Sequence, residues 1–333
     1  MNFLVVGLGS MGRRRIRCLK SLGFTNIFGF DVNPKRCEQA VQEYGISIID
    51  NPLLNDLDKN IHAWLICTPP DCHMKYAFKA TRLNCDSFIE ASVTDIDGIK
   101  DLAKLVEQAG TVTVPSCTMM YFRGPQIIKE LVSKKIVGKP FYFSFHRGEF
   151  LENWHPWEKI QEFYVSKRET GGCREIVPFE LTWINDIFGI PEPISCFKDK
   201  LSEMQADIDD IYVCCLKYPD NIVGNVLIEV LAKPEDIRTF TLVGSNGRLE
   251  WLGREKVVRF IVDGDKDWQT IKYDDGKPHQ NYIYSEQPYI DEIKDFVAAC
   301  NKKDASLFPN TLSLDVGVLE LLKKLEMKSG VNE

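Results

Sequence analysis

The sequence predicts a two-domain α/β protein. Its N-terminal part is expected to be a doubly wound parallel sheet, and its C-terminal part an α+β domain with a large, mostly antiparallel open sheet. Three observations support this prediction. The 333 residues are more than one small core requires. Short β-rich runs alternate with helical runs in the first third of the chain, and strands joined by short turns dominate the later part.

The first third of the chain repeats the order strand, helix. Short apolar runs predict strands at residues 2–8, 26–31, 63–69, 87–92 and 111–117. Helical periodicity lies between them, at residues 13–22, 34–44, 73–83 and 96–110. Strands that alternate with helices pair in parallel, with helices on both faces of the sheet. Because the alternation then stops, we expect a first domain over residues 1–118 and a second over residues 119–333.

The second domain is expected to begin with a helix and a strand and to continue as a meander. Helical periodicity occurs at residues 125–137 and 179–189, with a β-rich run at 139–150 between them. Further β-rich runs follow with short connections, at residues 193–201, 210–218, 221–232, 237–245, 247–253, 256–262 and 268–273. Consecutive strands with short turns predict an antiparallel sheet. Helical periodicity returns at residues 287–302 and 312–328.

Composition limits the class of protein. Hydrophobic residues make up 44% of the chain and charged residues 27%, which is typical of globular proteins. The net charge is −7, so we expect no nucleic-acid partner. No run of about 20 apolar residues occurs, so we expect no membrane span. The 11 cysteines are scattered and form no CxxC pair, which predicts reduced thiols, no bound metal and a cytoplasmic location.

A glycine-rich motif follows the first strand. The sequence VVGLGSMGRRR contains GxGxxG between an apolar strand and a helix. Such glycines permit a tight turn and a close approach of the backbone to a pyrophosphate at the helix N-terminus. We therefore predict a Rossmann-type dinucleotide site rather than a glycine-rich turn without a ligand. Its predicted binding residues are Gly7, Gly9, Ser10, Met11 and Gly12.

Asp31 ends the second strand, about 20 residues after the last glycine, where an acidic side chain binds the ribose hydroxyls. A carboxylate repels a 2′-phosphate, so Asp31 predicts NAD as the cofactor. Lys35 and Arg36 follow closely and offer positive charge, which leaves NADP open as an alternative.

Other cofactor contacts are expected at the carboxyl ends of the next strands, where open α/β sheets bind their ligands. Thr68 and Pro69 follow the third strand, and Glu90 ends the fourth. These three residues are expected to line the nicotinamide side. His73 lies just beyond Pro69 and is included with them, although a helix cap or a surface histidine explains it equally well.

These motifs, in this order, resemble the glucose-fructose oxidoreductase and inositol dehydrogenase family (GFO/IDH/MocA). The resemblance covers nearly the whole chain and implies an NAD(P)-dependent oxidoreductase. The stretch WHPWEKIQEFYVSK, followed by ETGG, is similar to one branch of that family, the sugar and nucleotide-sugar dehydrogenases of surface-polysaccharide pathways. The substrate that this similarity implies is a small-molecule sugar or nucleotide sugar.

The chain departs from this family at three positions that are usually catalytic. The family motif Glu-Lys-Pro reads Glu90-Ala91-Ser92 here, so the lysine at the nicotinamide is replaced by alanine. The aspartate and the histidine of the family's second-domain helix fall on Ile176 and Phe179. Apolar side chains leave a reacting alcohol without a proton acceptor. Other groups must therefore handle the proton, or the reaction differs from alcohol oxidation.

The stretch from Trp154 to Glu180 offers replacements. We predict three catalytic residues: His155, which exchanges a proton near neutral pH, Arg174, which suits a carboxylate or phosphate, and Glu180, a base if burial raises its pKa. The predicted substrate-binding residues are Trp154, Tyr164, Lys167 and Glu175. Each has a structural alternative: a packed corner for Trp154, a hydroxyl tied to backbone for Tyr164, and a static ion pair for Arg174.

Three functions are compatible with these residues. The first is an NAD(P)-dependent dehydrogenase that moves a hydride between a sugar carbon and nicotinamide. The second is an epimerase or eliminase that uses NAD transiently, with no net redox change. The third is a noncatalytic dinucleotide-binding sensor. The strands over residues 210–232 are expected to form an open sheet that pairs between subunits, which predicts a homo-oligomer, a dimer or a tetramer.

Overall fold

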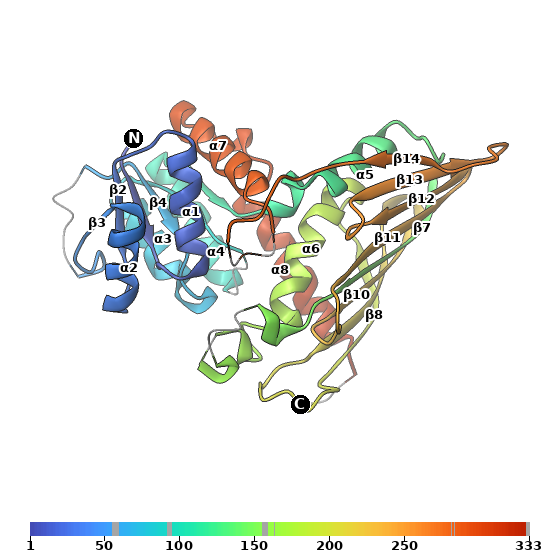
Figure 1. Ribbon diagram of the computed structural model, residues 1–333, viewed down its shortest axis with the longest axis horizontal. Helices are drawn as coiled ribbons and strands as arrows, with labels where there is room; N and C mark the ends of the chain where they lie inside the picture. The colour runs from blue at the N-terminus through green and yellow to red at the C-terminus, as the bar shows by residue number, and fades with distance from the viewer. Residues whose placement is uncertain are drawn as a thin grey trace. The chain divides into compact units, whose positions relative to one another are not determined.

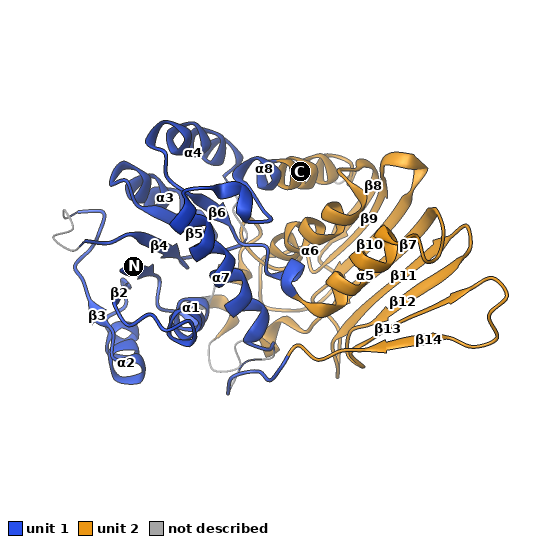
Figure 2. Cartoon of the chain, turned by 90° about the horizontal axis from the view of Figure 1, so that it is seen from above, with its two compact units in different colours: residues 1–121, 276–316 blue, residues 122–275, 317–333 orange. Residues whose placement is uncertain are grey.

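The structure is a computed structural model that describes residues 1–54, 60–91, 95–154, 159–162, 164–280, 282 and 284–330. The chain forms two compact units (Figure 2). Unit 1 comprises residues 1–121 and 276–316, and unit 2 comprises residues 122–275 and 317–333. The first break lies close to the expected boundary at residue 118. Residues 276–316 were expected in the second domain but belong to unit 1, because their helix packs on the N-terminal fold.

Unit 1 is built on a six-stranded sheet in the order β3-β2-β1-β4-β5-β6, with every pair parallel. The strands are β1 (Phe3–Val6), β2 (Ile27–Phe30), β3 (Ser47–Ile48), β4 (Ala63–Ile66), β5 (Asp86–Ile89) and β6 (Thr113–Pro115). Strands β1, β4 and β5 are buried along their whole length, as expected when helices cover both faces of a parallel sheet. The strand order reverses between β1 and β4, which confirms the predicted doubly wound sheet.

Four helices of unit 1 follow the predicted alternation (Figure 1): α1 (Ser10–Ser21), α2 (Pro34–Tyr44), α3 (His73–Arg82) and α4 (Ile96–Ala109). Helix α7 (Gln287–Lys302) comes from the later segment of this unit. Local capping explains two of the starts, because the side chains of Asn33 and Asp95 accept hydrogen bonds from the first turns of α2 and α4. Helix α8 (Leu312–Met327) begins in unit 1 and continues in unit 2.

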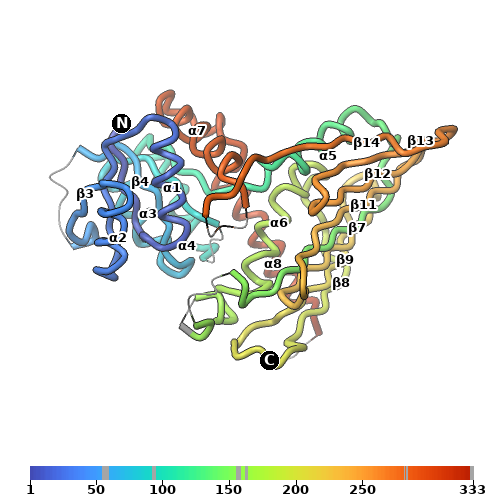
Figure 3. Tube along the Cα trace, in the orientation of Figure 1, coloured from blue at the N-terminus to red at the C-terminus, as the bar shows by residue number. Residues whose placement is uncertain are grey.

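Unit 2 contains an eight-stranded sheet in the order β14-β13-β12-β11-β7-β10-β9-β8 (Figure 3). Its strands are β7 (Pro140–Gly148), β8 (Glu192–Asp199), β9 (Ile211–Lys217), β10 (Val223–Glu229), β11 (Ile237–Gly244), β12 (Gly247–Leu252), β13 (Val257–Val262) and β14 (Gln269–Lys272). Only the pair β7 and β10 is parallel among the described strands of this sheet. The predicted, mostly antiparallel sheet is therefore confirmed.

Helices α5 (Arg123–Ser133) and α6 (Cys173–Phe188) lie on one face of this sheet (Figures 1 and 3). Aromatic side chains fill the space between them and the sheet: the Phe145 ring packs edge-on against Trp183, and both are buried. On the other face, Phe197, Val213 and Val243 are exposed. Helix α6 begins six residues before the predicted start at Phe179, because Pro178 is accommodated inside it instead of ending it.

All 11 cysteines are free thiols, and none of them forms a disulfide. Among the described residues, no helix is both long enough and apolar enough to cross a membrane.

Candidate functional site

The glycine loop of unit 1 has the backbone geometry that a dinucleotide requires. Gly7 has φ +88°, in the region that favours glycine, and a Cβ there would lie 2.6 Å from the Cys67 carbonyl oxygen. A Cβ at Gly12 would overlap the Gly7 carbonyl oxygen, so only glycine lets α1 approach the end of β1 this closely. Gly9 differs from both, because the nearest atom to a Cβ there is Arg36 Nη1 at 3.7 Å. A side chain's first carbon would therefore fit at Gly9 in ordinary van der Waals contact, unlike at Gly7 and Gly12.

The N-terminus of α1 is suited to an anion. Gly9 is the N-cap residue and supplies no side-chain hydrogen bond, and the first turn contains no acidic residue. The backbone N–H groups of this turn, which include those of Ser10 and Met11, are therefore not used by a capping side chain. The positive end of the helix dipole at such a site stabilises a pyrophosphate.

Asp31 is held against the glycine loop. Its Oδ2 accepts a hydrogen bond from the Leu8 N–H at 2.7 Å, and its Oδ1 accepts one from the Asn33 N–H at 2.8 Å. Each carboxylate oxygen retains a further lone pair for a ribose hydroxyl. Arg36 Nη1 lies 3.9 Å from Asp31 Oδ2, so positive charge does lie beside this carboxylate, as the sequence indicated.

The loop after β4 combines a predicted ligand contact with a structural histidine. The Thr68 Oγ1 atom is buried and has no hydrogen-bond partner among the described residues. His73 Nε2 lies 2.7 Å from the Thr68 carbonyl oxygen, which can only accept, so Nε2 donates. Burial lowers the pKa of His73 to about 4, so the ring is neutral at physiological pH. His73 thus fixes the backbone at Thr68, while Pro69 is exposed beside it.

Glu90 was expected at the nicotinamide, but the structure commits it to an ion pair. Both of its carboxylate oxygens accept hydrogen bonds from the Arg15 guanidinium of α1. Arg15 is fully buried, and its Nη1 also lies 2.8 Å from Glu292 of α7. The Glu292 carboxylate in turn accepts hydrogen bonds from Ser116 and Thr118. This network joins α1, β5 and α7 and stabilises unit 1.

In unit 2, Glu180 is fully buried and surrounded by donors. Its Oε1 accepts hydrogen bonds from Arg147 at 2.8 Å and from Arg238 at 3.2 Å, and its Oε2 accepts one from Trp183 Nε1 at 2.7 Å. Both carboxylate oxygens are thus occupied by donors of unit 2, and the side chain has no exposed surface. The predicted role of Glu180 as a base therefore does not fit the structure, in which it is the centre of a buried ion cluster.

Arg174 is also engaged within unit 2. Its Nε and Nη2 atoms lie 2.7 and 3.3 Å from the two carboxylate oxygens of Glu326 in α8, and its Nη1 donates to the Glu169 carbonyl at 2.6 Å. Arg174 therefore forms the static ion pair that was the structural alternative to its predicted catalytic role.

Glu175, which was predicted to bind the substrate, is a carboxylic acid with a raised pKa. It lies in the first turn of α6, and its Oε1 accepts a hydrogen bond from the Tyr164 hydroxyl at 2.7 Å. Burial raises the pKa of Glu175 to about 7, and the hydrogen bond from Tyr164 and the charge of Arg147 oppose that rise. A carboxyl group with this pKa exchanges a proton near neutral pH, which is the requirement for general acid–base catalysis.

The other predicted residues of this region are less informative. Lys167 has an exposed side chain, and its backbone forms an isolated β-bridge with that of Asp207. Trp154 is half-buried, and its Nε1 has no hydrogen-bond partner among the described residues. His155 lies outside the described residues.

Sequence reasoning did not foresee the role of the arginines in α1. Arg14 and Arg15 of this helix are both buried. Arg14 and Arg17 pair with Glu286, which returns from the far end of the sequence. Tyr282, four residues before Glu286, also contacts α1, because its hydroxyl lies 2.8 Å from the Ser10 carbonyl oxygen. The cluster of three arginines after the glycine motif was the available signal in the sequence. Buried guanidinium groups require acidic partners, which here come from distant parts of the chain.

Comparisons with solved structures support the fold over the whole chain. An oxidoreductase from Agrobacterium radiobacter, in complex with NAD+, L-tartaric acid and magnesium, has a TM-score of 0.83 at 13% identity, covering 100% of this chain and 97% of that one. Levoglucosan dehydrogenase in complex with NADH has a TM-score of 0.82 at 15% identity, covering 99% and 96%. An inositol dehydrogenase homolog from Azotobacter vinelandii, complexed with NAD+, has a TM-score of 0.81 at 13% identity, covering 99% and 95%.

A sequence relative is 2,7-anhydro-N-acetylneuraminate hydratase from Mediterraneibacter gnavus, 22% identical over 236 residues. The match covers 66% of this chain and 59% of that protein. Two family models also match: the oxidoreductase family with an NAD-binding Rossmann fold over residues 1–116, and the GFO/IDH/MocA C-terminal domain over residues 126–250. Together these two models match most of the chain, so the chain belongs to the GFO/IDH/MocA family, whose first domain is an NAD-binding Rossmann fold.

Proposed function

We propose that the protein is an NAD-dependent dehydrogenase of a sugar or nucleotide sugar. Bound NAD supplies the acceptor for the hydride that leaves a carbinol carbon of the substrate. The residues that would hold it are the glycine loop, Asp31 and the loop that contains Thr68. The substrate's hydroxyl also requires a group of the protein that accepts its proton.

The observation that supports this proposal best is the pair of Glu175 and Tyr164. Oxidation of an alcohol releases one proton from the hydroxyl as the carbonyl forms, and a base must accept it. The pKa of Glu175, raised to about 7 by burial, leaves a substantial carboxylate fraction at neutral pH and a proton affinity high enough to accept the proton. The Tyr164 hydroxyl donates a hydrogen bond to this carboxylate at 2.7 Å and thereby orients it. This pair would take over the roles of the family's lysine and histidine, whose positions are occupied here by Ala91 and Phe179.

The sugar class rests on names of similar proteins. One solved structure is levoglucosan dehydrogenase in complex with NADH and levoglucosan, and another is an inositol dehydrogenase homolog. Levoglucosan, inositol and 2,7-anhydro-N-acetylneuraminate are all polyhydroxylated rings. A dense array of hydroxyl groups is recognised by carboxylate, amide and phenol groups such as Glu175 and Tyr164.

A second function, without net redox change, is favoured by the relative that is a hydratase. In such a reaction NAD would return to its starting state in each cycle. The same residues of this chain would then transfer the proton twice, once in each direction, which a carboxyl group with a pKa near 7 permits. The two functions differ in a single observable, the accumulation of reduced cofactor.

The experiment that tests the proposal uses the purified protein with NAD and a panel of levoglucosan, inositol, 2,7-anhydro-N-acetylneuraminate and nucleotide sugars. Absorbance of reduced nicotinamide and mass spectrometry of the sugar are recorded together. A dehydrogenase accumulates reduced nicotinamide in proportion to the oxidised sugar. Sugar conversion without accumulation assigns the second function instead.

The variant Glu175→Gln tests the residue assignment in the same assay. We expect kcat to fall by a factor of about 100 to 10,000, whereas Glu203→Gln, an exposed carboxylate of unit 2, serves as the matched control. Turnover in Glu175→Gln equal to that of the control would exclude Glu175 as the base. Binding of NAD with no conversion of any sugar would favour a noncatalytic sensor.

A homo-oligomer, a dimer or a tetramer, is part of the proposal. The sheet face opposite α6 exposes Phe197, Val213 and Val243, and a face with exposed apolar side chains favours burial against a second copy. A location in the cytoplasm fits the free state of the cysteines. Sedimentation velocity would test the oligomeric state.

A further inference from the structure

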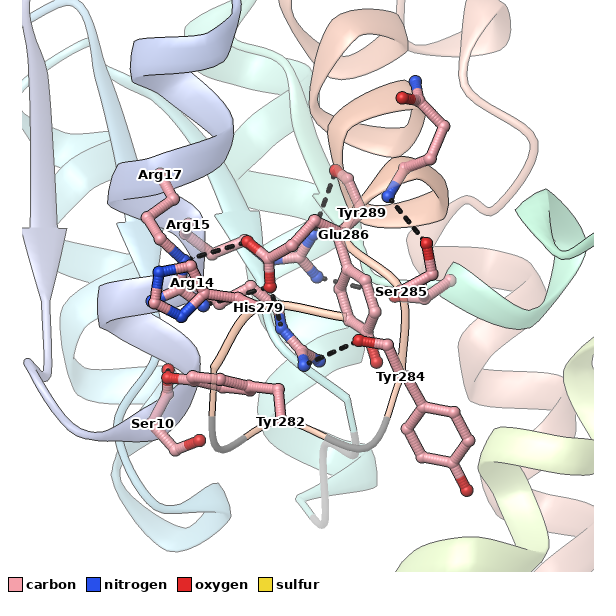
Figure 4. Close-up of polar contacts among 12 residues, drawn as sticks. Ser10, Arg14, Arg15, Arg17, His279, Tyr282, Tyr284, Ser285, Glu286 and Tyr289 are labelled. Carbon is pink, nitrogen blue, oxygen red and sulfur yellow. Dashed lines mark hydrogen bonds and ion pairs between the residues drawn. The ribbon is translucent and has the colours of Figure 1, made fainter. Parts of the chain in front are cut away.

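A segment near the end of the chain contacts one face of α1. The segment consists of Tyr282 and residues 284–289, and it belongs to unit 1 with α1 itself. Ser10, Arg14 and Arg17 recur on that helix at the spacing of a single face. All three contact the segment, as Figure 4 shows. We refer to these residues of the segment as the α1 strap.

Charge fixes the strap to α1. Glu286 bridges two arginines: its Oε1 lies 3.0 Å from Arg14 Nε, and its Oε2 lies 2.9 Å from Arg17 Nε. Arg14 and Glu286 have side chains with 4% and 16% of their surface exposed, so water weakens this contact little. A carboxylate shared between two guanidinium groups has a defined direction. The backbone before Glu286 is therefore held in a defined place relative to α1.

Tyr282 is held by two kinds of contact. The guanidinium carbons of Arg14 and Arg17 each lie 4.4 Å from the centre of its ring, a cation–π distance. Its hydroxyl donates a hydrogen bond to the Ser10 carbonyl oxygen at 2.8 Å. In Figure 4 the phenol points from the strap toward Ser10. The ring and the hydroxyl thus connect the basic face of α1 to its first residue.

Ser10 is also part of the glycine loop. It is the first residue of α1 and follows Gly9, the N-cap position whose side is open to a ligand. The N–H groups of this turn bind an anion well only if their directions are fixed before binding. Because no side chain caps α1 at Gly9, the contact from Tyr282 is a long-range restraint on this turn.

We infer that Tyr282 is a positioning residue of the NAD site, which fixes Ser10 and the first turn of α1 in the direction that the pyrophosphate requires. The inference rests on the NAD site of the proposed function. It adds a residue that no motif indicates, about 270 positions from the loop it restrains. It also gives the arginine-rich start of α1 a role, because Arg14 and Arg17 hold the tyrosine ring.

Substitutions of Tyr282 should weaken NAD binding in two steps. Tyr282→Phe keeps the ring and removes one hydrogen bond, so we expect the Kd for NAD to rise about threefold to tenfold. Tyr282→Ala also removes the ring between the two arginines, and we expect a rise of about tenfold to a hundredfold. Because the binding groups remain, most of the change should appear in the dissociation rate of NAD.

Isothermal calorimetry of NAD binding to the full chain tests this inference, with Tyr142→Phe as the control. Tyr142 lies in unit 2, and its hydroxyl accepts a hydrogen bond from Asn225. The thermal midpoint without NAD is measured for every variant. If Tyr282 only stabilised the fold, its loss would lower that midpoint and leave the Kd of the folded protein unchanged. If it positions the loop, the Kd rises, and KM for NAD rises while kcat at saturating NAD stays the same.

The outcomes are distinct. A graded loss of affinity in Tyr282→Phe and Tyr282→Ala, with Tyr142→Phe unchanged, supports the inference. Unchanged affinity in both variants overturns it, as does an equal loss in the control. A loss in Tyr282→Ala with none in Tyr282→Phe overturns the part assigned to the Ser10 hydrogen bond. Absence of NAD binding in the wild-type protein would instead contradict the cofactor of the proposed function.

Discussion

The glycine loop of unit 1 and helix α6 of unit 2 were both expected to form the active site, and they differ in how their residues are used. In the glycine loop, the absence of side chains at the predicted positions allows close approach to the backbone. At Gly9, for example, the nearest atom to a Cβ would be Arg36 Nη1 at 3.7 Å. In α6, two of the predicted charged residues are closed off by partners of opposite charge. A site formed by backbone can be predicted from the glycines of the sequence. The role of a charged side chain cannot be predicted until its partners in the fold are known.

The largest effect that would test this contrast is expected at Glu180. Replacing it with alanine removes one of the two carboxylates that pair with the buried Arg147 and Arg238, and Glu149 is the other. We expect the free energy of unfolding to fall by about 3 to 5 kcal/mol. Denaturant unfolding measures the loss, with Glu203→Ala as the exposed control. Full stability with lost turnover would mean that Glu180 is catalytic after all.

Gly9 tests the other side of the contrast. Its φ is −70° and a Cβ there would lie no closer than 3.7 Å to the protein, so the backbone accommodates a side chain, and the thermal midpoint of Gly9→Val checks that the variant folds. We expect its side chain to obstruct the pyrophosphate and to weaken NAD binding by about 100-fold, or about 2.7 kcal/mol. Calorimetry measures this, and Gly317→Ala, a helical position with open space around it, is the control. Normal NAD affinity in Gly9→Val would place the cofactor elsewhere.

The raised pKa of Glu175 predicts how stability depends on pH. The carboxyl binds a proton more tightly in the folded state, with a pKa of about 7, than in the unfolded state, with its ordinary value of 4.5. Its contribution to stability is therefore fully present below pH 4.5 and is lost as the pH rises through 7. The loss amounts to at most about 3 kcal/mol. Urea unfolding across this range should show a decline that Glu175→Gln lacks, and parallel curves would refute the shifted pKa.

Arg174 should give the smallest effect. Its pair with Glu326 is partly exposed, with 26% and 21% of the two side chains accessible. Such pairs contribute about 0.2 to 1 kcal/mol, so Arg174→Gln should be only slightly less stable. We expect KM for the sugar to stay within about twofold of the wild-type value. A large rise in KM would restore the predicted role of Arg174 in binding the substrate.

The sequence was sufficient where neighbours along the chain determine the structure. The strand, the glycines and Asp31 lie close together in sequence, and the loop they form is fixed by local backbone sterics. The alternation of strands and helices likewise indicated the parallel sheet.

The sequence was insufficient where partners are distant. Glu180 meets Arg147 and Arg238 across 33 and 58 positions, and Glu90 meets Arg15 across 75. Arg14 meets Glu286 across 272 positions. An amphipathic pattern such as that of α7 shows that one face is buried but does not identify the partner. The return of residues 276–316 to unit 1 could not be inferred for the same reason.

The pH dependence of kcat for NAD reduction would show whether Glu175 is the base. It is measured in the wild-type protein and in the variants Glu175→Gln and Glu180→Gln. If Glu175 is the base, the wild-type rate rises with pH through an inflection near 7. Glu175→Gln should lose both rate and inflection, and folded Glu180→Gln should keep the inflection. An inflection that persists in Glu175→Gln would contradict the account and assign the proton to another group.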